Sequence, residues 1–361
     1  MLSTTDDLRI KEIKELSPPG EVMREIPRTL TATRVVMAAR NAIHSILTGT
    51  DDRLLVIVGP CSIHDPIAAV DYAERLTALR ERLADRLEIV MRVYFEKPRT
   101  IVGWKGLIND PDLDDTFDIN KGLRLARNLL SAVNNLGLPA ATEFLDMTTP
   151  QYIADLVSWA AIGARTTESQ IHRELASGLS CPVGFKNGTD GDIRIAADAV
   201  KSAAHPHHFM AVTKGGRSGI ASTTGNEDCH IILRGGKLPN YDAAHVEQAA
   251  AELVKSGLSP KLMIDTSHAN SGKKPENQPL VAADIARQVA GGEERIMGVM
   301  IESNIVAGRQ DVKPGVPLTY GQSITDGCID WDTTVTVLEQ LAGAADARGE
   351  ARRRATCART A

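Results

Sequence analysis

The chain alternates short apolar runs with longer segments of helical periodicity, and this alternation constrains its fold more than any other feature. Eight runs are predicted to be strands, at residues 54–58, 89–93, 140–144, 161–164, 183–186, 231–234, 262–265 and 296–301. Helices are predicted between most of them, at residues 66–83, 121–136, 150–160, 192–203, 243–256 and 279–289. Strands that alternate with helices pair in parallel through right-handed crossovers. Eight such units favour an α/β fold of the closed (β/α)8 type, a TIM barrel, over an open doubly wound sheet.

Three segments fall outside a minimal barrel. Residues 1–53 form an N-terminal extension, for which a regulatory or oligomerisation role is expected. Residues 54–345 are predicted to be the barrel, with an inserted β-hairpin at about residues 209–225 around two adjacent glycines. Residues 346–361 are basic and lack periodicity, which predicts a disordered tail.

Composition excludes several classes of protein. The net charge of −5 and the 4% aromatic content argue against a nucleic-acid partner. Apolar runs stay well short of the roughly 20 residues that a membrane span needs, so we expect no membrane association and a cytoplasmic location. The 5 cysteines are scattered and odd in number, which predicts reduced thiols rather than a disulfide framework.

Basic residues follow several of the predicted strands, where the active site of a barrel is built. For a single basic residue a solvated surface ion pair is the commoner role. Convergent cations at equivalent positions instead require an anionic ligand to offset their repulsion, and a small phosphorylated carboxylate fits them. These cations are Arg92, Lys97, Arg165, Lys186 and Arg234.

Four further residues near strand ends offer metal-ligand chemistry: Cys61, His268, Glu302 and Asp326. Together they suit a divalent transition metal ion, and Mn, Fe, Co and Zn all remain compatible with so mixed a set. Taken one by one, they more commonly have structural roles: a core thiol, a hydrogen-bonded core histidine and two loop-capping carboxylates.

Six motifs carry a resemblance to a known family. They are GPCSIHDP (59–66), RVYFEKPRTIVGWKGLINDP (92–111), GARTTESQ (163–170), PVGFKNGTDG (182–191), HIILRGG (230–236) and DTSHAN (265–270). The chain resembles the type I, aromatic-feedback-regulated 3-deoxy-7-phosphoheptulonate synthases from about residue 6 to residue 342.

The resemblance implies a homotetrameric (β/α)8 barrel that condenses phosphoenolpyruvate with D-erythrose 4-phosphate and water. The products would be 3-deoxy-D-arabino-heptulosonate 7-phosphate and phosphate, in the first step of the shikimate pathway to aromatic amino acids. Through it, the metal ligands match Cys61, His268, Glu302 and Asp326. The substrate-binding residues match Arg92, Lys97, Pro98, Arg99, Thr100, Arg165, Lys186 and Arg234. Either Glu143 or a metal-bound ligand is expected to assist water addition, and Lys97 either to donate a proton or to bind an anion.

The resemblance also implies a separate site for an aromatic amino acid. Its residues match Asp6, Asp7, Pro150, Gln151, Leu175, Leu179, Ser180, Phe209 and Ala211, with the two aspartates supplied by a neighbouring subunit. Ala211 stands where Ser or Gly is usual. Because its methyl group fills space that a phenol oxygen would need, we expect phenylalanine rather than tyrosine to be the inhibitor.

The sequence leaves three alternative functions open. One is a related enzyme that joins phosphoenolpyruvate to a different aldose, although the KPRT segment at residues 97–100 favours the four-carbon acceptor. Another is a metal-independent relative, which would lack the cysteine at position 61. The third is a catalytically silent regulatory subunit, which the presence of every expected site residue disfavours.

Overall fold

Eight parallel strands close into a barrel, as predicted. The computed structural model describes residues 5–313 and 315–360, with side chains described as far as residue 353. The strands follow the order β1-β10-β9-β8-β5-β4-β3-β2 around the barrel. Their bounds are β1 Leu54–Gly59, β2 Leu87–Arg92, β3 Ala140–Glu143, β4 Trp159–Ile162, β5 Val183–Lys186, β8 Cys229–Leu233, β9 Leu262–Asp265 and β10 Ile296–Glu302. Almost every strand residue is buried, as expected for parallel strands that helices cover.

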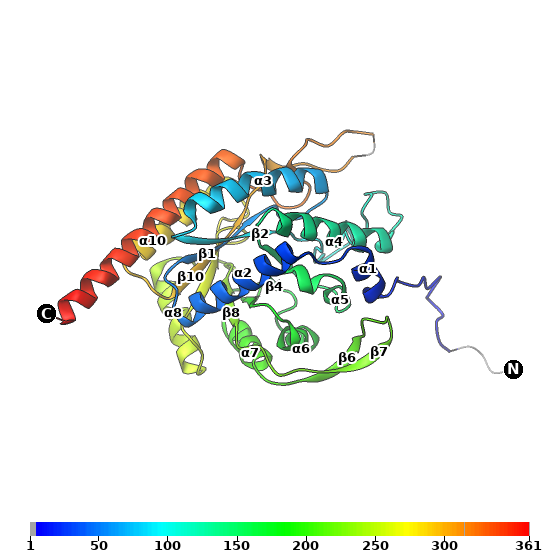
Figure 1. Ribbon diagram of the computed structural model, residues 1–361, viewed down its shortest axis with the longest axis horizontal. Coiled ribbons are helices and arrows are strands. Elements are labelled where there is room, and N and C mark those ends of the chain that lie inside the picture. The colour runs from blue at the N-terminus through cyan, green and yellow to red at the C-terminus, as the bar shows by residue number, and fades with distance from the viewer. Residues whose placement is uncertain (1–4, 314, 361) are drawn as a thin grey trace.

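Helices surround this barrel (Figure 1). They are α3 Pro66–Leu83, α4 Ile119–Asn135, α5 Pro150–Ile153, α6 Gln170–Gly178, α7 Arg194–Ala203, α8 Ala243–Lys255, α9 Gln278–Ala290 and α10 Trp331–Thr360. Side-chain caps begin several of them, such as Asp65, whose carboxylate accepts from Ile67 N at 2.8 Å. Because the eight strands of the barrel are parallel, their carboxyl ends all lie at one rim.

One predicted helix was too long, and the barrel helix that follows β4 was missed. The helix expected at 150–160 ends as α5 and a short 3₁₀ turn, η1 Ala154–Leu156, and β4 begins at Trp159. Here the backbone pairs with neighbouring strands, since Ser158 N donates to Ala140 O at 2.8 Å and Ala160 N to Pro182 O at 3.0 Å. Helix α6 was not predicted, because few of its nine residues are apolar and its buried stripe is short.

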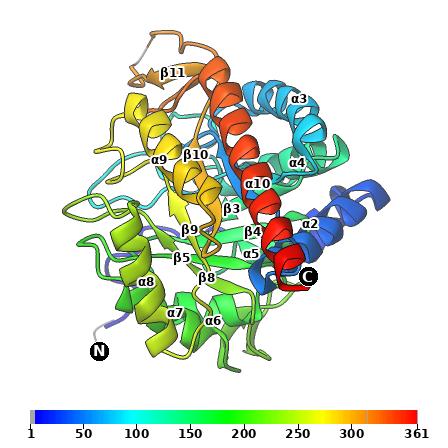
Figure 2. The ribbon, with the colours of Figure 1, turned by 90° about the vertical axis from the view of Figure 1, so that its left-hand side faces the viewer.

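The N-terminal extension contributes directly to the barrel core. Helix α1 covers Pro19–Glu25 and helix α2 covers Leu30–Thr48. Ile43 and Ile46 of α2 pack in one cluster with barrel-interior residues such as Leu55, Trp159 and Met300. Residues 1–53 are thus not only an appendage, since α2 supplies part of the packed interior. Figure 2 shows α2 in blue next to the barrel.

Two insertions leave the barrel. Strands β6 His208–Val212 and β7 Ser218–Ser222 form an antiparallel hairpin, close to the predicted range, and Figure 1 shows it extending from the α6 and α7 side. Gly216 adopts a φ of 77° in its turn, a conformation that glycine favours. A second, unpredicted insertion carries β11 Val306–Arg309 and β12 Gln322–Ser323.

The C-terminal helix differs from the expected disordered tail. Helix α10 continues to Thr360, so the prediction of disorder over residues 346–361 is wrong up to that point, and residue 361 lies outside the described residues. Arg348 explains the order, because its guanidinium donates to Ile296 O at 2.9 Å and to Asp52 O at 3.0 Å. Across the described ranges, each helix is too short or too polar to cross a membrane.

Candidate active site

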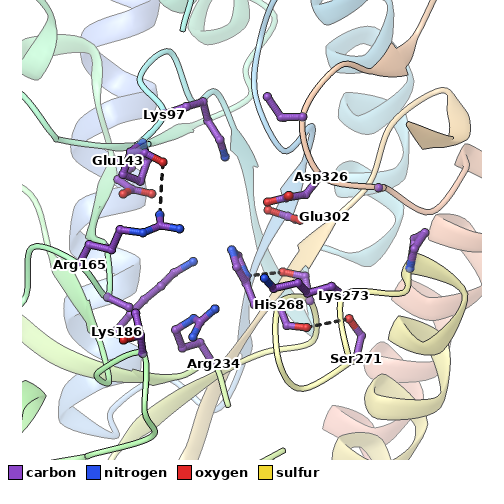
Figure 3. Close-up of a pocket in the computed structure, with 18 of the residues that line it drawn as sticks. Lys97, Glu143, Arg165, Lys186, Arg234, His268, Ser271, Lys273, Glu302 and Asp326 are labelled. Carbon is purple, nitrogen blue, oxygen red and sulfur yellow. Dashed lines mark hydrogen bonds between the residues drawn. The ribbon is translucent and has the colours of Figure 1, made fainter. Parts of the chain in front are cut away.

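A cavity of about 340 Å³ opens at the carboxyl ends of the barrel strands. Glu143, Lys186 and Glu302 are the last residues of β3, β5 and β10, and all three line it. The barrel topology therefore places side chains from distant parts of the sequence around one space, as the (β/α)8 fold requires. Figure 3 shows this space between two facing groups of side chains.

The first group is cationic and comprises Arg165, Lys186 and Arg234 (Figure 3). Lys186 is 3% exposed, and its Nζ lies 3.1 Å from Asp265 Oδ2. Arg165 donates to Pro98 O at 3.3 Å, and burial lowers the pKa of Arg234. The cations of this wall outnumber its carboxylate neighbours, so the space favours an anion.

Arg92 lies buried beside this space, at 1% exposure. Its Nη2 donates to Glu302 Oε1 at 3.1 Å. The other terminal nitrogen, Nη1, has no hydrogen-bond partner among the described residues. A buried guanidinium with a free donor is unfavourable unless a ligand accepts from it, and a substrate carboxylate would do so.

The second group could hold a metal ion. Ligand atoms of Cys61, Glu302 and Asp326 lie within 4.8 Å of one another, and Cys61 Sγ is 3.7 Å from Asp326 Oδ2. Lys97 Nζ lies 3.1 Å from Cys61 Sγ. One soft sulfur and two hard carboxylates suit a borderline divalent ion. Burial, together with the negative charge of the nearby Glu302, raises the pKa of the Cys61 thiol to about 11, so a cation is needed to stabilise the thiolate.

His268 lies outside that group of three but lines the same cavity, on the side of Glu302 and Asp326 (Figure 3). Its Nδ1 is 2.8 Å from Asp265 Oδ2. Because a carboxylate only accepts, Nδ1 carries the hydrogen and Nε2 is left as a potential ligand atom. The φ of 54° at His268 is a left-handed conformation that non-glycine residues rarely adopt, and such strain is often found at functional sites.

Glu143 supplies an unpaired acceptor. Its carboxylate is 6% exposed, and Oε1 has no partner in the described part of the chain. A Cβ at Gly163 would lie 2.4 Å from Oε1, so only glycine leaves room for the carboxylate there. A buried acceptor without a partner indicates a water or ligand donor at this point.

The segment expected to receive erythrose 4-phosphate is only partly in the cavity. Lys97, Pro98 and Arg99 line it, whereas Thr100 does not. Arg99 donates its Nε to Trp104 O at 2.8 Å. The structure therefore brings three of these four residues to the site.

Among the lining residues that sequence reasoning missed are Thr189, Ser271, Lys273 and Arg309. Lys273 follows His268 closely in one loop, and its amide donates to His268 O at 2.7 Å. Because Lys273 lies so close in sequence to the candidate metal ligand His268, its place near the site could have been predicted. Arg309 comes from β11, which the sequence did not predict, so nothing indicated it.

Apart from Asp6 and Asp7, the residues expected to bind an effector lie on or next to α5, α6 and strand β6 of the hairpin. Pro150 and Gln151 belong to α5, and Lys214 of the hairpin turn donates to Gln151 O. Helix α6 is tied to the hairpin by a Ser177–Thr223 hydroxyl contact of 2.7 Å. Leu175 and Leu179 lie on or just after α6, Ser180 follows them, and Phe209 and Ala211 lie on β6. Asp6 and Asp7 are exposed in the N-terminal segment, which projects from the barrel in Figure 1.

Barrel, cation-rich cavity and thiol–carboxylate cluster together define the class: a (β/α)8 enzyme for small anionic substrates with a candidate metal centre. Residues 29–339 match the model of the DAHP synthetase I family, and the chain belongs to this family. The chain is 64% identical over 343 residues to the Phe-sensitive phospho-2-dehydro-3-deoxyheptonate aldolase of Escherichia coli, covering 95% of this chain and 98% of that protein.

Two further proteins are similar to the chain over most of its length. The chain is 57% identical over 347 residues to the Haemophilus influenzae phospho-2-dehydro-3-deoxyheptonate aldolase, covering 96% of each. The solved structure of phospho-2-dehydro-3-deoxyheptonate aldolase from Francisella tularensis aligns with a TM-score of 0.92 at 55% identity. It covers 94% of this chain and 99% of that chain. The likeness therefore extends over nearly the whole length of these proteins.

Proposed function

We propose that the chain condenses phosphoenolpyruvate with D-erythrose 4-phosphate and water to give 3-deoxy-D-arabino-heptulosonate 7-phosphate and phosphate. The cation-rich cavity at the barrel rim carries this proposal, because both substrates are phosphorylated. The names of the relatives, all phospho-2-dehydro-3-deoxyheptonate aldolases, support it. The reaction would be the first step of aromatic amino-acid synthesis and would take place in the cytoplasm.

Phosphoenolpyruvate would bind to five cations: Arg92, Lys97, Arg165, Lys186 and Arg234. The free Nη1 of Arg92 suits its carboxylate. The guanidinium groups of Arg165 and Arg234, which line the cavity, suit its phosphate. Erythrose 4-phosphate would enter along residues 97–100, where Arg99 and Thr100 would take its phosphate.

Lys97 would stand between the two substrates. Burial alone would lower its pKa, but electrostatic interactions with Cys61, Glu302 and Asp326 raise it above its ordinary value. Its ammonium therefore stays protonated, fit to bind an anion and to give a proton to the alkoxide formed from the aldehyde.

Cys61, His268, Glu302 and Asp326 would hold a divalent ion, for which Mn, Fe, Co and Zn are all suitable. The clustering of three of these donors within 4.8 Å supports the fit. When bound, such an ion supplies Lewis-acid polarisation of the aldehyde of erythrose 4-phosphate.

The chain's own residues would then manage charge and protons. Carbon 3 of phosphoenolpyruvate forms the new bond to the aldehyde carbon, and a water oxygen adds at carbon 2. Glu143, whose Oε1 has no hydrogen-bond partner among the described residues, would take a proton from that water. Arg165, Lys186 and Arg234 would stabilise the phosphate as it leaves the tetrahedral intermediate.

We further propose a homotetramer regulated by phenylalanine. Apolar side chains are exposed on the N-terminal segment, such as Ile13 at 76%, and on one face of the hairpin, where Met210 at 89% pairs with Ile220 at 80%. Contiguous exposed apolar surface favours a subunit contact. The 64% identical relative is named Phe-sensitive, and Ala211 disfavours a phenol oxygen.

One assay tests the proposal. Purified protein is given both substrates, with and without EDTA and added Mn, and product is measured. We expect activity that EDTA abolishes and Mn restores. Failure to form product would indicate a silent subunit. Activity that survives EDTA would indicate a metal-independent enzyme, and activity only with other aldoses would indicate a different acceptor.

Two further experiments test regulation and assembly. Titration with phenylalanine, tyrosine and tryptophan tests regulation, and size-exclusion chromatography with light scattering tests the tetramer.

A further inference from the structure

Arg92 lies against the face of an aromatic ring. Its Cζ is 3.9 Å from the centroid of Tyr94, and both side chains are 1% exposed. Arg92 is the last residue of β2 and Tyr94 follows two positions later, so both side chains point to the same face of the chain, into the barrel. A desolvated guanidinium over a ring is held by a cation–π attraction that is stronger than the same contact in water.

The in-plane contacts of Arg92 are long. Nε lies 3.4 Å from Pro60 O, and Nη2 lies 3.4 Å from Cys61 O. Only the 3.1 Å contact to Glu302 has ordinary length, and Nη1 has no partner in the described chain. These hydrogen bonds all lie along one edge of the guanidinium plane, so they leave the guanidinium group free to tilt about that edge. The ring face of Tyr94 opposes this tilt.

The hydroxyl of Tyr94 does not explain why a tyrosine stands there. Its Oη is buried and has no hydrogen-bond partner among the residues that the structure describes. An unsatisfied buried hydroxyl is unfavourable for stability. The aromatic ring, rather than the hydroxyl, is therefore the part of Tyr94 with a structural partner at the site.

We propose that Tyr94 is a positioning residue that holds the guanidinium of Arg92 in the plane required to bind the carboxylate of phosphoenolpyruvate. This inference rests on the proposed function, in which Arg92 contacts that carboxylate. Tyr94 itself touches Arg92 and acts through it.

Two variants separate the ring from the hydroxyl. Tyr94→Phe keeps the ring face, so KM for phosphoenolpyruvate should stay within about twofold of wild type. Tyr94→Leu keeps an apolar side chain without a π face, so this KM should rise by about 3- to 30-fold. KM for erythrose 4-phosphate should change less. Tyr94→Met, measured alongside, repeats the comparison with a more flexible side chain that fills the space better.

Two controls test whether the effect passes through Arg92. Trp159→Leu removes another buried aromatic ring from the same barrel-interior cluster and should lower the melting temperature without the selective rise in KM. In an Arg92→Gln background, adding Tyr94→Leu should leave KM for phosphoenolpyruvate unchanged.

Three results would overturn the inference: an equal rise in KM for the Phe and Leu variants, the same further rise in the Arg92→Gln background, or unchanged KM in both Tyr94→Leu and Tyr94→Met. An inactive wild-type enzyme would instead refute the proposed function, so the two failures are distinguishable.

Discussion

Asp265 holds two elements of the site together, and its replacement by asparagine tests the arrangement. It is fully buried at the end of β9, and its Oδ2 accepts from Lys186 Nζ at 3.1 Å and from His268 Nδ1 at 2.8 Å. Although burial works against it, the positive charge of Lys186 and the hydrogen bond from His268 hold the pKa of Asp265 well below its usual range. Asp265→Asn keeps the shape of the side chain and removes its charge.

The Asp265→Asn substitution should weaken metal binding and also lower the stability of the fold. Losing the carboxylate partner of a candidate metal-binding histidine should weaken metal affinity by about 10- to 100-fold. Leaving the ammonium of Lys186 buried without its counter-charge should cost about 3–5 kcal/mol of stability. The second effect is the larger, so the folded fraction must be measured before the metal affinity is interpreted.

The assay combines urea unfolding with calorimetric titration of Mn into folded protein. Ser267→Ala is the control, because it keeps the carboxylate of Asp265 and removes the hydroxyl that lies 2.5 Å from Asp265 Oδ1 and 2.8 Å from His268 Nδ1, which should cost about 1 kcal/mol. If Asp265→Asn unfolds like wild type and binds Mn within twofold of it, the assigned roles of Asp265 are wrong.

Three further predictions concern other residues. Cys61→Ala should lose bound metal while remaining folded, and full metal content by elemental analysis would reject Cys61 as a ligand. Lys186→Ala and Arg234→Ala should each lower kcat/KM for phosphoenolpyruvate by about 10- to 150-fold, and an unchanged value would return either residue to a structural role. Burial lowers the pKa of His230 from 6.5 to about 4, so its contribution to stability is complete above pH 6.5 and is lost as pH falls towards 4, by roughly 3 kcal/mol. His230→Gln should abolish this dependence in urea unfolding between pH 4 and 7, whereas exposed His205→Gln should retain it.

Local sequence signals located most of the fold. Strands β5 and β9 begin and end as predicted, because their flanking residues mark clear turns. Strand β4 was placed two residues late, since the preceding stretch fits a helix or a strand by periodicity alone. The insertion with β11 and β12 carries no strong local pattern and went unpredicted.

Sequence by itself determined which residues lie at or near the ends of the strands, and hence the set of cations and candidate metal ligands that face one rim. Only the tertiary structure decided which of them touch. Arg92 meets Glu302 across 210 positions of sequence, and Lys186 meets Asp265 across 79. Propensity and capping act within a few residues, whereas these contacts, and the packing of Ile43 from α2 into the barrel, depend on how the sheet closes. The pairing of Tyr94 with Arg92 was readable as a spacing of two, but only the burial of both gave it an energetic meaning.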